Sequence, residues 1–133
     1  MIRRVLGACL VACLAVAPAH AWDIRTTAVM VNQFPSVVTA KMHNEVQRDL
    51  NQNEHLEHSS YFTSSGNEAR VYELLMIDTR NNGNVCRAIV YIQWAFGDVT
   101  CRLDGPTATG MSCGGQAVYE AGSKTCKADL VVQ

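Results

Sequence analysis

The chain has little charge and lacks an apolar run long enough to span a membrane. Only 17% of its 133 residues are charged and 48% are hydrophobic, a balance that excludes an intrinsically disordered chain. The sequence also lacks internal repeats, low-complexity tracts and interdomain linkers. A chain of this length has room for one domain.

The first 21 residues have the layout of a secretory signal peptide. Two arginines precede a run of 13 apolar residues, from Val5 to Ala17, and an Ala-x-Ala cleavage signal ends at Ala21. A membrane-spanning helix needs roughly 20 residues, so this run is not expected to be an anchor. We therefore predict a cleaved signal over residues 1–21 and a single domain over 22–133, exported to the periplasm or secreted.

A second processing route remains open. The segment from Leu10 to Cys13 resembles the box at which bacterial lipoproteins are cleaved and lipidated on cysteine. The apolar run continues beyond Cys13, however, and cleavage there would leave a short leader. In the preferred route Cys9 and Cys13 leave with the signal peptide.

The mature chain has no excess of basic residues. Removal of the leader leaves nine lysines and arginines against twelve acidic residues, a formal net charge of −3. Such a surface is a poor match for nucleic acid or anionic lipid, which argues against both as primary partners. Nothing in the sequence indicates a cofactor.

Four cysteines remain in the mature chain, all within its last 48 residues: Cys86, Cys101, Cys113 and Cys126. An even number in an exported protein predicts two disulfides, and four cysteines allow three pairings. A zinc site is less favoured because the Cys-x-x-Cys spacing is absent.

The first half of the mature chain is predicted to form a strand and a helix. Ile24–Val31 is rich in β-branched residues, which favours a strand. Apolar residues then recur at intervals of four, and Pro35 suits the first turn of a helix. We expect an amphipathic helix from Pro35 to Asn53, with an alternative end at His58. The recurring residues are Val38, Met42, Val46 and Leu50.

The second half is predicted to be a run of antiparallel strands. Val71–Thr79 and Val85–Phe96 flank Asn82-Gly83, a dipeptide typical of two-residue hairpin turns. That turn would pair Leu75 with Val90, Ile77 with Ala88, Val71 with Trp94, and Asp78 with Arg87. Gly97-Asp98 is expected to make the next turn, before Val99–Leu103, and the last hairpin joins Gln116–Glu120 to Thr125–Val132.

The predicted register favours one disulfide pairing. It places Cys101 opposite Trp94, so that Cys86 lies eight residues, or roughly 26 Å, away along the strand. That distance excludes a bridge between Cys86 and Cys101. Of the two remaining pairings we prefer Cys86 with Cys113 and Cys101 with Cys126.

These elements predict an α+β domain, with one amphipathic helix packed on a four- to five-stranded antiparallel meander sheet and disulfides in the C-terminal half. The order of strand, helix and meander resembles the architecture of cystatin-type domains. The Gln-x-Val-x-Gly segment of cystatins is absent, so inhibition of cysteine proteases is not implied. Fold by itself does not give function.

Two histidines are the best candidates for acid-base or metal chemistry. His55 and His58, three residues apart beside Glu57, could lie on neighbouring faces of a helix end. A third ligand is not evident, and His43 would lie about 18 Å away along a continuous helix. A solvated helix end explains the pair more simply, so no metal site is predicted.

The segment 110–114 has the Gly-x-Ser-x-Gly spacing of a hydrolase nucleophile. That motif needs a strand-to-helix turn above a large parallel sheet, whereas a strand is expected to follow Ser112. A glycine-rich loop explains the spacing better.

Tyr61 and Phe62 are the candidate binding residues. They lie in a serine- and glycine-rich stretch, Ser59–Asn67, whose composition resembles recognition loops. A plain connection with one aromatic ring in the core is the alternative.

The sequence therefore predicts a small exported binding protein that acts through protein–protein contact, as an inhibitor, an immunity-type protein or an envelope accessory protein. The alternative function is a small secreted hydrolase or toxin that uses His55 and His58.

Overall fold

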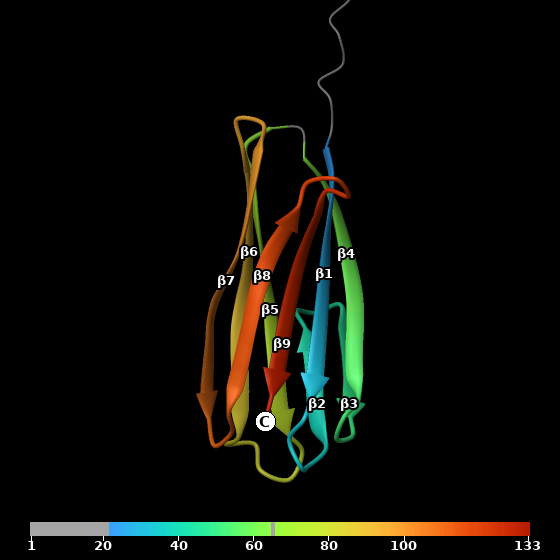
Figure 1. The fold of residues 1–133 in the computed structure, drawn as a ribbon, viewed down its shortest axis with the longest axis vertical. Helices are drawn as coiled ribbons and strands as arrows, with labels where there is room; N and C mark the ends of the chain where they lie inside the picture. Colours follow the sequence, from blue (N-terminus) through green and yellow to red (C-terminus); the bar gives the residue numbers. More distant parts are fainter. Residues whose placement is uncertain (1–21, 65) are drawn as a thin grey trace, which may run out of the picture.

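The computed structural model describes residues 22–64 and 66–133, which form two β-sheets that face each other (Figure 1). The predicted signal peptide lies outside the described residues. Nine strands make up the two layers. They are β1 (Trp22–Asn32), β2 (Val38–Met42), β3 (Val46–Leu50), β4 (His55–Ser64), β5 (Glu68–Asp78), β6 (Val85–Ala95), β7 (Asp98–Thr109), β8 (Cys113–Glu120) and β9 (Thr125–Val132).

The strands do not follow one another as a single meander. One sheet has the order β4-β1-β9-β8 and the other β3-β2-β5-β6-β7. The first and last strands, β1 and β9, are parallel neighbours in the middle of the four-stranded sheet. A parallel pair at this point requires the chain to cross between the layers.

The prediction of an α+β domain is wrong, because the described residues contain no helix. The segment expected to be helical forms β2, the turn His43–Glu45 and β3. Val38, Ala40 and Met42 are fully buried and alternate with partly exposed residues, which is the period of a strand. The likeness to cystatin-type domains, which depended on the helix, is overturned with it.

The hairpin β5–β6 exists, but its predicted register is wrong. Leu75 lies opposite Arg87, and Tyr72 opposite Val90. The chain reverses over Thr79–Asn84 instead of the two residues Asn82-Gly83, since the Asp78 N–H still donates to the Asn84 carbonyl. The buried residues of β5 are consequently Tyr72, Leu74, Met76 and Asp78. Leu75 and Ile77 are only partly buried, and Val71 is exposed.

The β6–β7 turn is also shifted from its predicted place. Ala95 pairs with Asp98, so Phe96 and Gly97 make the turn, both at positive φ. Gly97 accepts this conformation without strain, whereas Phe96 is a bulky residue in the left-handed region. The Phe96 N–H donates to the Asn67 side chain at 3.1 Å, which holds the turn.

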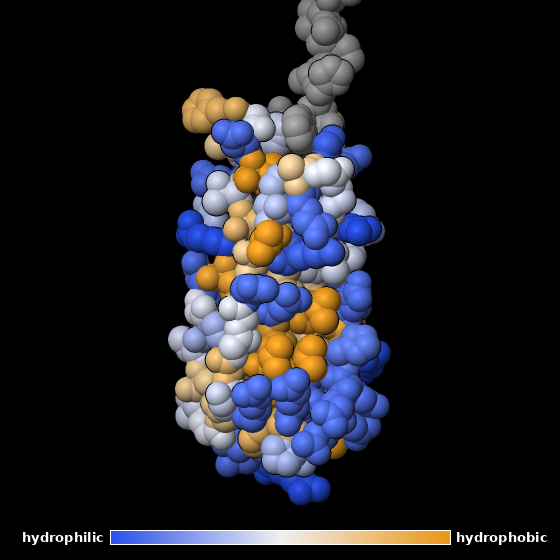
Figure 2. Space-filling model, viewed as in Figure 1, coloured by the Kyte–Doolittle hydropathy of each residue, from blue (hydrophilic) through white to orange (hydrophobic). Residues whose placement is uncertain are grey.

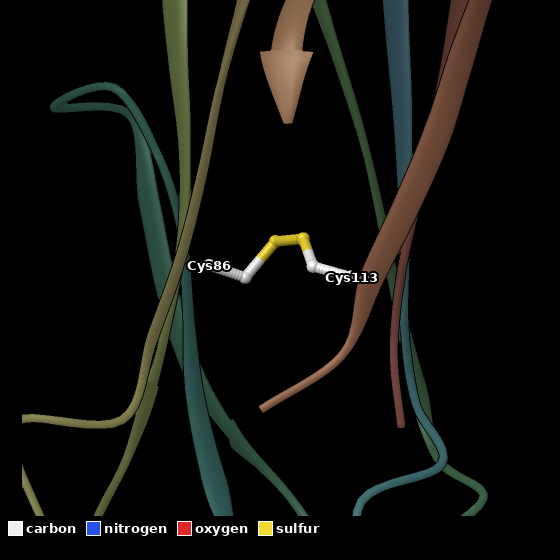
Figure 3. Close-up of a disulfide and its surroundings, with 2 residues drawn as sticks. All are labelled: Cys86 and Cys113. Atoms are coloured by element: carbon white, nitrogen blue, oxygen red, sulfur yellow. A yellow bond between two sulfur atoms is a disulfide. The ribbon is translucent and has the colours of Figure 1, made fainter. Parts of the chain in front are cut away.

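Both disulfides cross between the sheets, and the predicted pairing is confirmed. Cys86 on β6 bonds Cys113 on β8 (Figure 3), and Cys101 on β7 bonds Cys126 on β9. A small disulfide-bonded β domain of this kind is consistent with an oxidising extracellular or periplasmic location. Together the bridges join the two layers on the side of β7 and β8.

The core lies between the sheets and is built from the inward-facing residues of both. Ile24, Met30 and Leu130 of the four-stranded sheet meet Leu74, Met76 and the apolar positions of β6. On the opposite surface of the four-stranded sheet, Val29, Val31 and Val131 remain partly exposed, and apolar side chains gather in the middle of this face (Figure 2). No helix among the described residues is long and apolar enough to cross a membrane.

Candidate functional site: the groove between β4 and β5

A groove opens between β4 and β5 because the hairpin that covers their lower halves is short. β2 and β3 each have 5 residues, whereas β4 has 10 and β5 has 11. The hairpin ends part way up the molecule, while β4 and β5 continue to the loop that joins them (Figure 1). We call this uncovered space the β4–β5 groove.

The groove has a volume of about 410 Å³ and is open to solvent. It takes its lining from β4, from the first half of β5 and from the β2–β3 turn. The lining residues are His43, Glu45, Ser60, Tyr61, Phe62, Thr63, Arg70, Val71 and Tyr72.

Two aromatic side chains form the floor of the groove. Phe62 and Tyr72 come from opposite sheets and are 8% and 7% exposed. The Arg70 guanidinium lies 5.4 Å from the centre of the Phe62 ring and pairs with Glu68 at 2.7 Å. Arg70 faces the inside of the sandwich by strand alternation, yet it is exposed, because none of the described strands covers it there. The Arg70 side chain thus partly covers an apolar floor.

A polar cluster closes the lower end of the groove. The Glu45 carboxylate accepts a hydrogen bond from the Ser60 hydroxyl at 2.7 Å and pairs with His58 Nε2 at 3.0 Å. The Ser60 and Tyr72 hydroxyl oxygens lie 3.2 Å apart. Glu45, in the β2–β3 turn, and Tyr72, in β5, belong to the five-stranded sheet, whereas His58 and Ser60 lie in β4 of the other sheet. The cluster therefore joins the layers where the disulfides do not reach.

The cluster does not have the arrangement of a nucleophilic triad. The Ser60 hydroxyl gives its one proton to the Glu45 carboxylate, so it does not donate to His58 as an activated serine would. Ser60 is also buried, at 8% exposure. The arrangement can bind and orient a polar group at the groove end, but it lacks a free base next to a nucleophile.

The predicted binding pair, Tyr61 and Phe62, lies in this groove but not in a loop. Both residues belong to β4, and neighbouring strand residues point to opposite faces. Phe62 enters the core, and Tyr61 is 67% exposed at the groove rim. The expectation that Ser59–Asn67 is a loop is therefore wrong for residues 59–64, because pairing with β1 continues to Ser64.

The two candidate histidines are not brought together. His55 and His58 lie in β4 rather than at a helix end, and their odd spacing sends the side chains to opposite faces. His58 faces Glu45, whereas His55 is exposed and its carbonyl accepts a hydrogen bond from Arg48. No three metal-ligating side chains cluster among the residues that the structure describes.

The Gly-x-Ser-x-Gly segment forms the β7–β8 connection. The Ser112 N–H and carbonyl pair with the Gln133 backbone, and Cys113 is in a disulfide. No helix follows Ser112, so the structural context of a nucleophile elbow is absent from the described chain.

Three residues of the groove were missed by sequence reasoning: Glu45, Arg70 and Tyr72. Glu45 lies within the segment that was predicted to be helical. The predicted hairpin register placed Tyr72 on the face that points away from the core. The alternation of Val38, Ala40 and Met42 was the available signal, since it predicts a strand that ends just before Glu45.

The chain was compared with models of protein families, with curated proteins and with solved structures, and none of the three comparisons gave a match.

Proposed function

We propose that this chain is a small exported binding protein that acts through protein–protein contact, in the periplasm or outside the cell. The observation that carries the proposal is the β4–β5 groove, which has an aromatic floor and an exposed tyrosine at its rim. Tyrosine is enriched among the residues that dominate binding energy at protein interfaces. An inhibitor, an immunity-type protein and an envelope accessory protein would all use such a site.

The scaffold around the groove supports this proposal. Two disulfides fix the sheets on the β7–β8 side, and the Glu45 cluster joins them on the β3–β4 side. A site held on rigid strands loses little conformational entropy on binding, which favours affinity.

The alternative, a secreted hydrolase or toxin with His55 and His58, gains no support from the geometry. The two imidazoles cannot act on one substrate from opposite faces of β4. His58 is paired with Glu45, and the nearest hydroxyl, on Ser60, is bonded to that same carboxylate.

The experiment is affinity capture from the native extract with the oxidised mature chain. Wild-type protein should retain a stoichiometric partner, and Tyr61→Ala should weaken retention at least about tenfold, the loss expected for a central interface tyrosine. Phe62 is unsuitable for this test because it is part of the core.

Val118→Ala is the matched control. Val118 is 53% exposed on β8, at the opposite edge of the four-stranded sheet, so its truncation should leave retention unchanged. The proposal fails if the folded chain elutes alone or if Tyr61→Ala binds as well as wild type.

A further inference from the structure

Among the described strands, the first half of β5 has a paired neighbour on only one side. β6 pairs with β5 along Glu68–Ile77, whereas the pairing with β2 ends where Met42 meets Leu74. Beyond that point the His43 N–H donates to the Glu73 carbonyl at 2.6 Å, and the β2–β3 turn then leaves the sheet. The segment 68–72 is therefore an unpaired strand edge, although the second half of β5 lies within a sheet of five strands.

The backbone groups that face this edge can be identified from two hydrogen bonds. The Asp78 N–H points toward β6, because it donates to Asn84, and the Glu73 carbonyl points toward β2, because it accepts from His43. Backbone N–H and C=O directions alternate along a strand. The N–H and C=O groups of Ala69 and Val71 consequently face the groove side, and no partner for them occurs among the described residues.

Exposure agrees with this geometry. Ala69, Arg70 and Val71 are all exposed, although the rest of β5 alternates between buried and partly buried residues. An uncovered strand edge of this kind is a template for a further strand, and proteins normally shorten, charge or cover such edges.

We propose that the free edge of β5 at Ala69 and Val71 binds an extended polypeptide segment, which adds a strand beside β5 and fills the β4–β5 groove. This inference rests on the proposed binding function and names its mode of recognition. The free edge, residues 68–72, is about 17 Å long at ~3.3 Å per residue, so it accommodates roughly five residues of the partner.

The charges around the edge favour a partner segment with little net charge. Glu68 is paired with Arg70, Glu73 with Arg87, and Glu45 with His58. Since Glu68 and Glu73 are each paired with an arginine and Glu45 is already hydrogen-bonded, a strongly charged strand would gain no compensating partner from these carboxylates.

The residues on the floor of the groove determine which side chains are favoured in the partner segment. Residues of an added strand would point alternately into the groove and toward the outer face of the sheet. Those that point inward would meet Phe62 and Tyr72, which favours apolar side chains at alternate positions. The outward residues would lie beside Val71, which is 50% exposed.

The test is a selection of phage-displayed random octapeptides on the full oxidised mature chain. Selected peptides should be apolar at alternate positions, and their binding should fall at least about tenfold on Val71→Pro. Proline removes the Val71 N–H, which faces the free edge, and leaves the hydrogen bonds to β6 intact. Val71→Ala keeps that N–H and should change binding only slightly.

Amide hydrogen exchange on the wild-type chain gives an independent readout if Val71→Pro does not fold. The Ala69 and Val71 amides should exchange rapidly in the free chain and become protected when a selected peptide is added. Failure to select any peptide, equal binding by folded Val71→Pro, or unchanged exchange at both amides would each overturn the proposal.

Two further outcomes separate this inference from its alternatives. In the absence of peptide, both amides could become more protected as the concentration of the chain is raised. That result would identify a second copy of the chain as the occupant of the edge and would overturn the proposal. Retention of the extract partner by Val71→Pro but not by Tyr61→Ala would overturn the strand-addition mode and leave the proposed function standing.

Discussion

Cys86 of β6 and Cys113 of β8 are bonded across the sandwich, with their Cα atoms 6.0 Å apart. The second bridge, between Cys101 and Cys126, likewise joins one sheet to the other, at a Cα separation of 5.8 Å. Both cross-links lie on the β7–β8 side of the molecule. The opposite side depends on the Glu45 hydrogen bonds and is where the groove opens.

The two disulfides should contribute nearly equally to stability. They close loops of similar length, with sequence separations of 27 and 25 residues. Replacement of either pair by alanines should lower the free energy of unfolding by about 3 kcal/mol, as measured by guanidinium denaturation. A loss below about 1 kcal/mol for one pair would contradict this expectation.

A buried hydroxyl on β1 should be a source of instability. Thr26 is fully buried, and its Oγ1 has no hydrogen-bond partner among the residues that the structure describes. Thr26→Val keeps the shape of the side chain and should raise the free energy of unfolding by about 1 kcal/mol. The neighbouring Thr27→Val is the control and should lower it, because the Thr27 hydroxyl is bonded to Ser59 at 2.9 Å. Equal effects of the two substitutions in thermal melts would refute the explanation.

Asp78 should make stability depend on pH in the acid range. The Arg80 backbone N–H and the Ser36 hydroxyl donate to its carboxylate and hold its pKa below the ordinary value of 3.8. A lowered pKa in the folded state stabilises the protein above the ordinary pKa, and this contribution is lost as pH falls below about 4. Asp78→Asn should reduce stability at neutral pH and weaken its decline in acid.

Thermal melts between neutral pH and about pH 3 test this dependence. Asp98→Asn, at an exposed position beside the β6–β7 turn, is the control and should leave the pH profile as it is in wild type. An unchanged profile for Asp78→Asn would show that the carboxylate does not stabilise the fold in this way.

The Glu45 cluster should matter for stability at the groove end. Glu45→Ala leaves the buried Ser60 hydroxyl without its acceptor and should lower the free energy of unfolding by about 1 kcal/mol. Glu45→Gln keeps an acceptor oxygen and should cost less. Denaturation curves that rank the two variants in the opposite order would count against this role.

The helix was predicted wrongly because the decisive spacing fits two structures. Val38 and Met42, like Val46 and Leu50, are four residues apart, an interval that suits one face of a helix and also one face of a strand. The turn at His43–Glu45 lies between the two pairs, and His43 is at positive φ. The turn contains neither glycine nor proline, so it lacked the two residues that most strongly mark a turn in a sequence.

The hairpin register was missed because the turn is fixed by tertiary contacts. Asn82-Gly83 favours a two-residue turn locally, but the Asp78 carboxylate binds Ser36, Arg80 and Asn84 and holds a longer loop. Since Ser36 lies 42 residues away in sequence, no short-range pattern could report it.

The disulfide pairing was predicted correctly despite the wrong register. In the structure Cys101 lies opposite Ile92, so Cys86 is six residues, or roughly 20 Å, away along β6. Either register therefore excludes a Cys86–Cys101 bridge. Of the candidate site, Tyr61 and Phe62 were identified by residue type, but the groove depends on strand lengths that the sequence pattern did not reveal.

The most direct test of the central claim is amide hydrogen exchange of the chain alone and in complex with the partner captured from its native extract. The β4–β5 groove account predicts that protection on binding is concentrated at Ala69 and Val71, with β1 and β9 unchanged. Protection confined to the outer face of the four-stranded sheet, around Val29, Val31 and Val131, would contradict it.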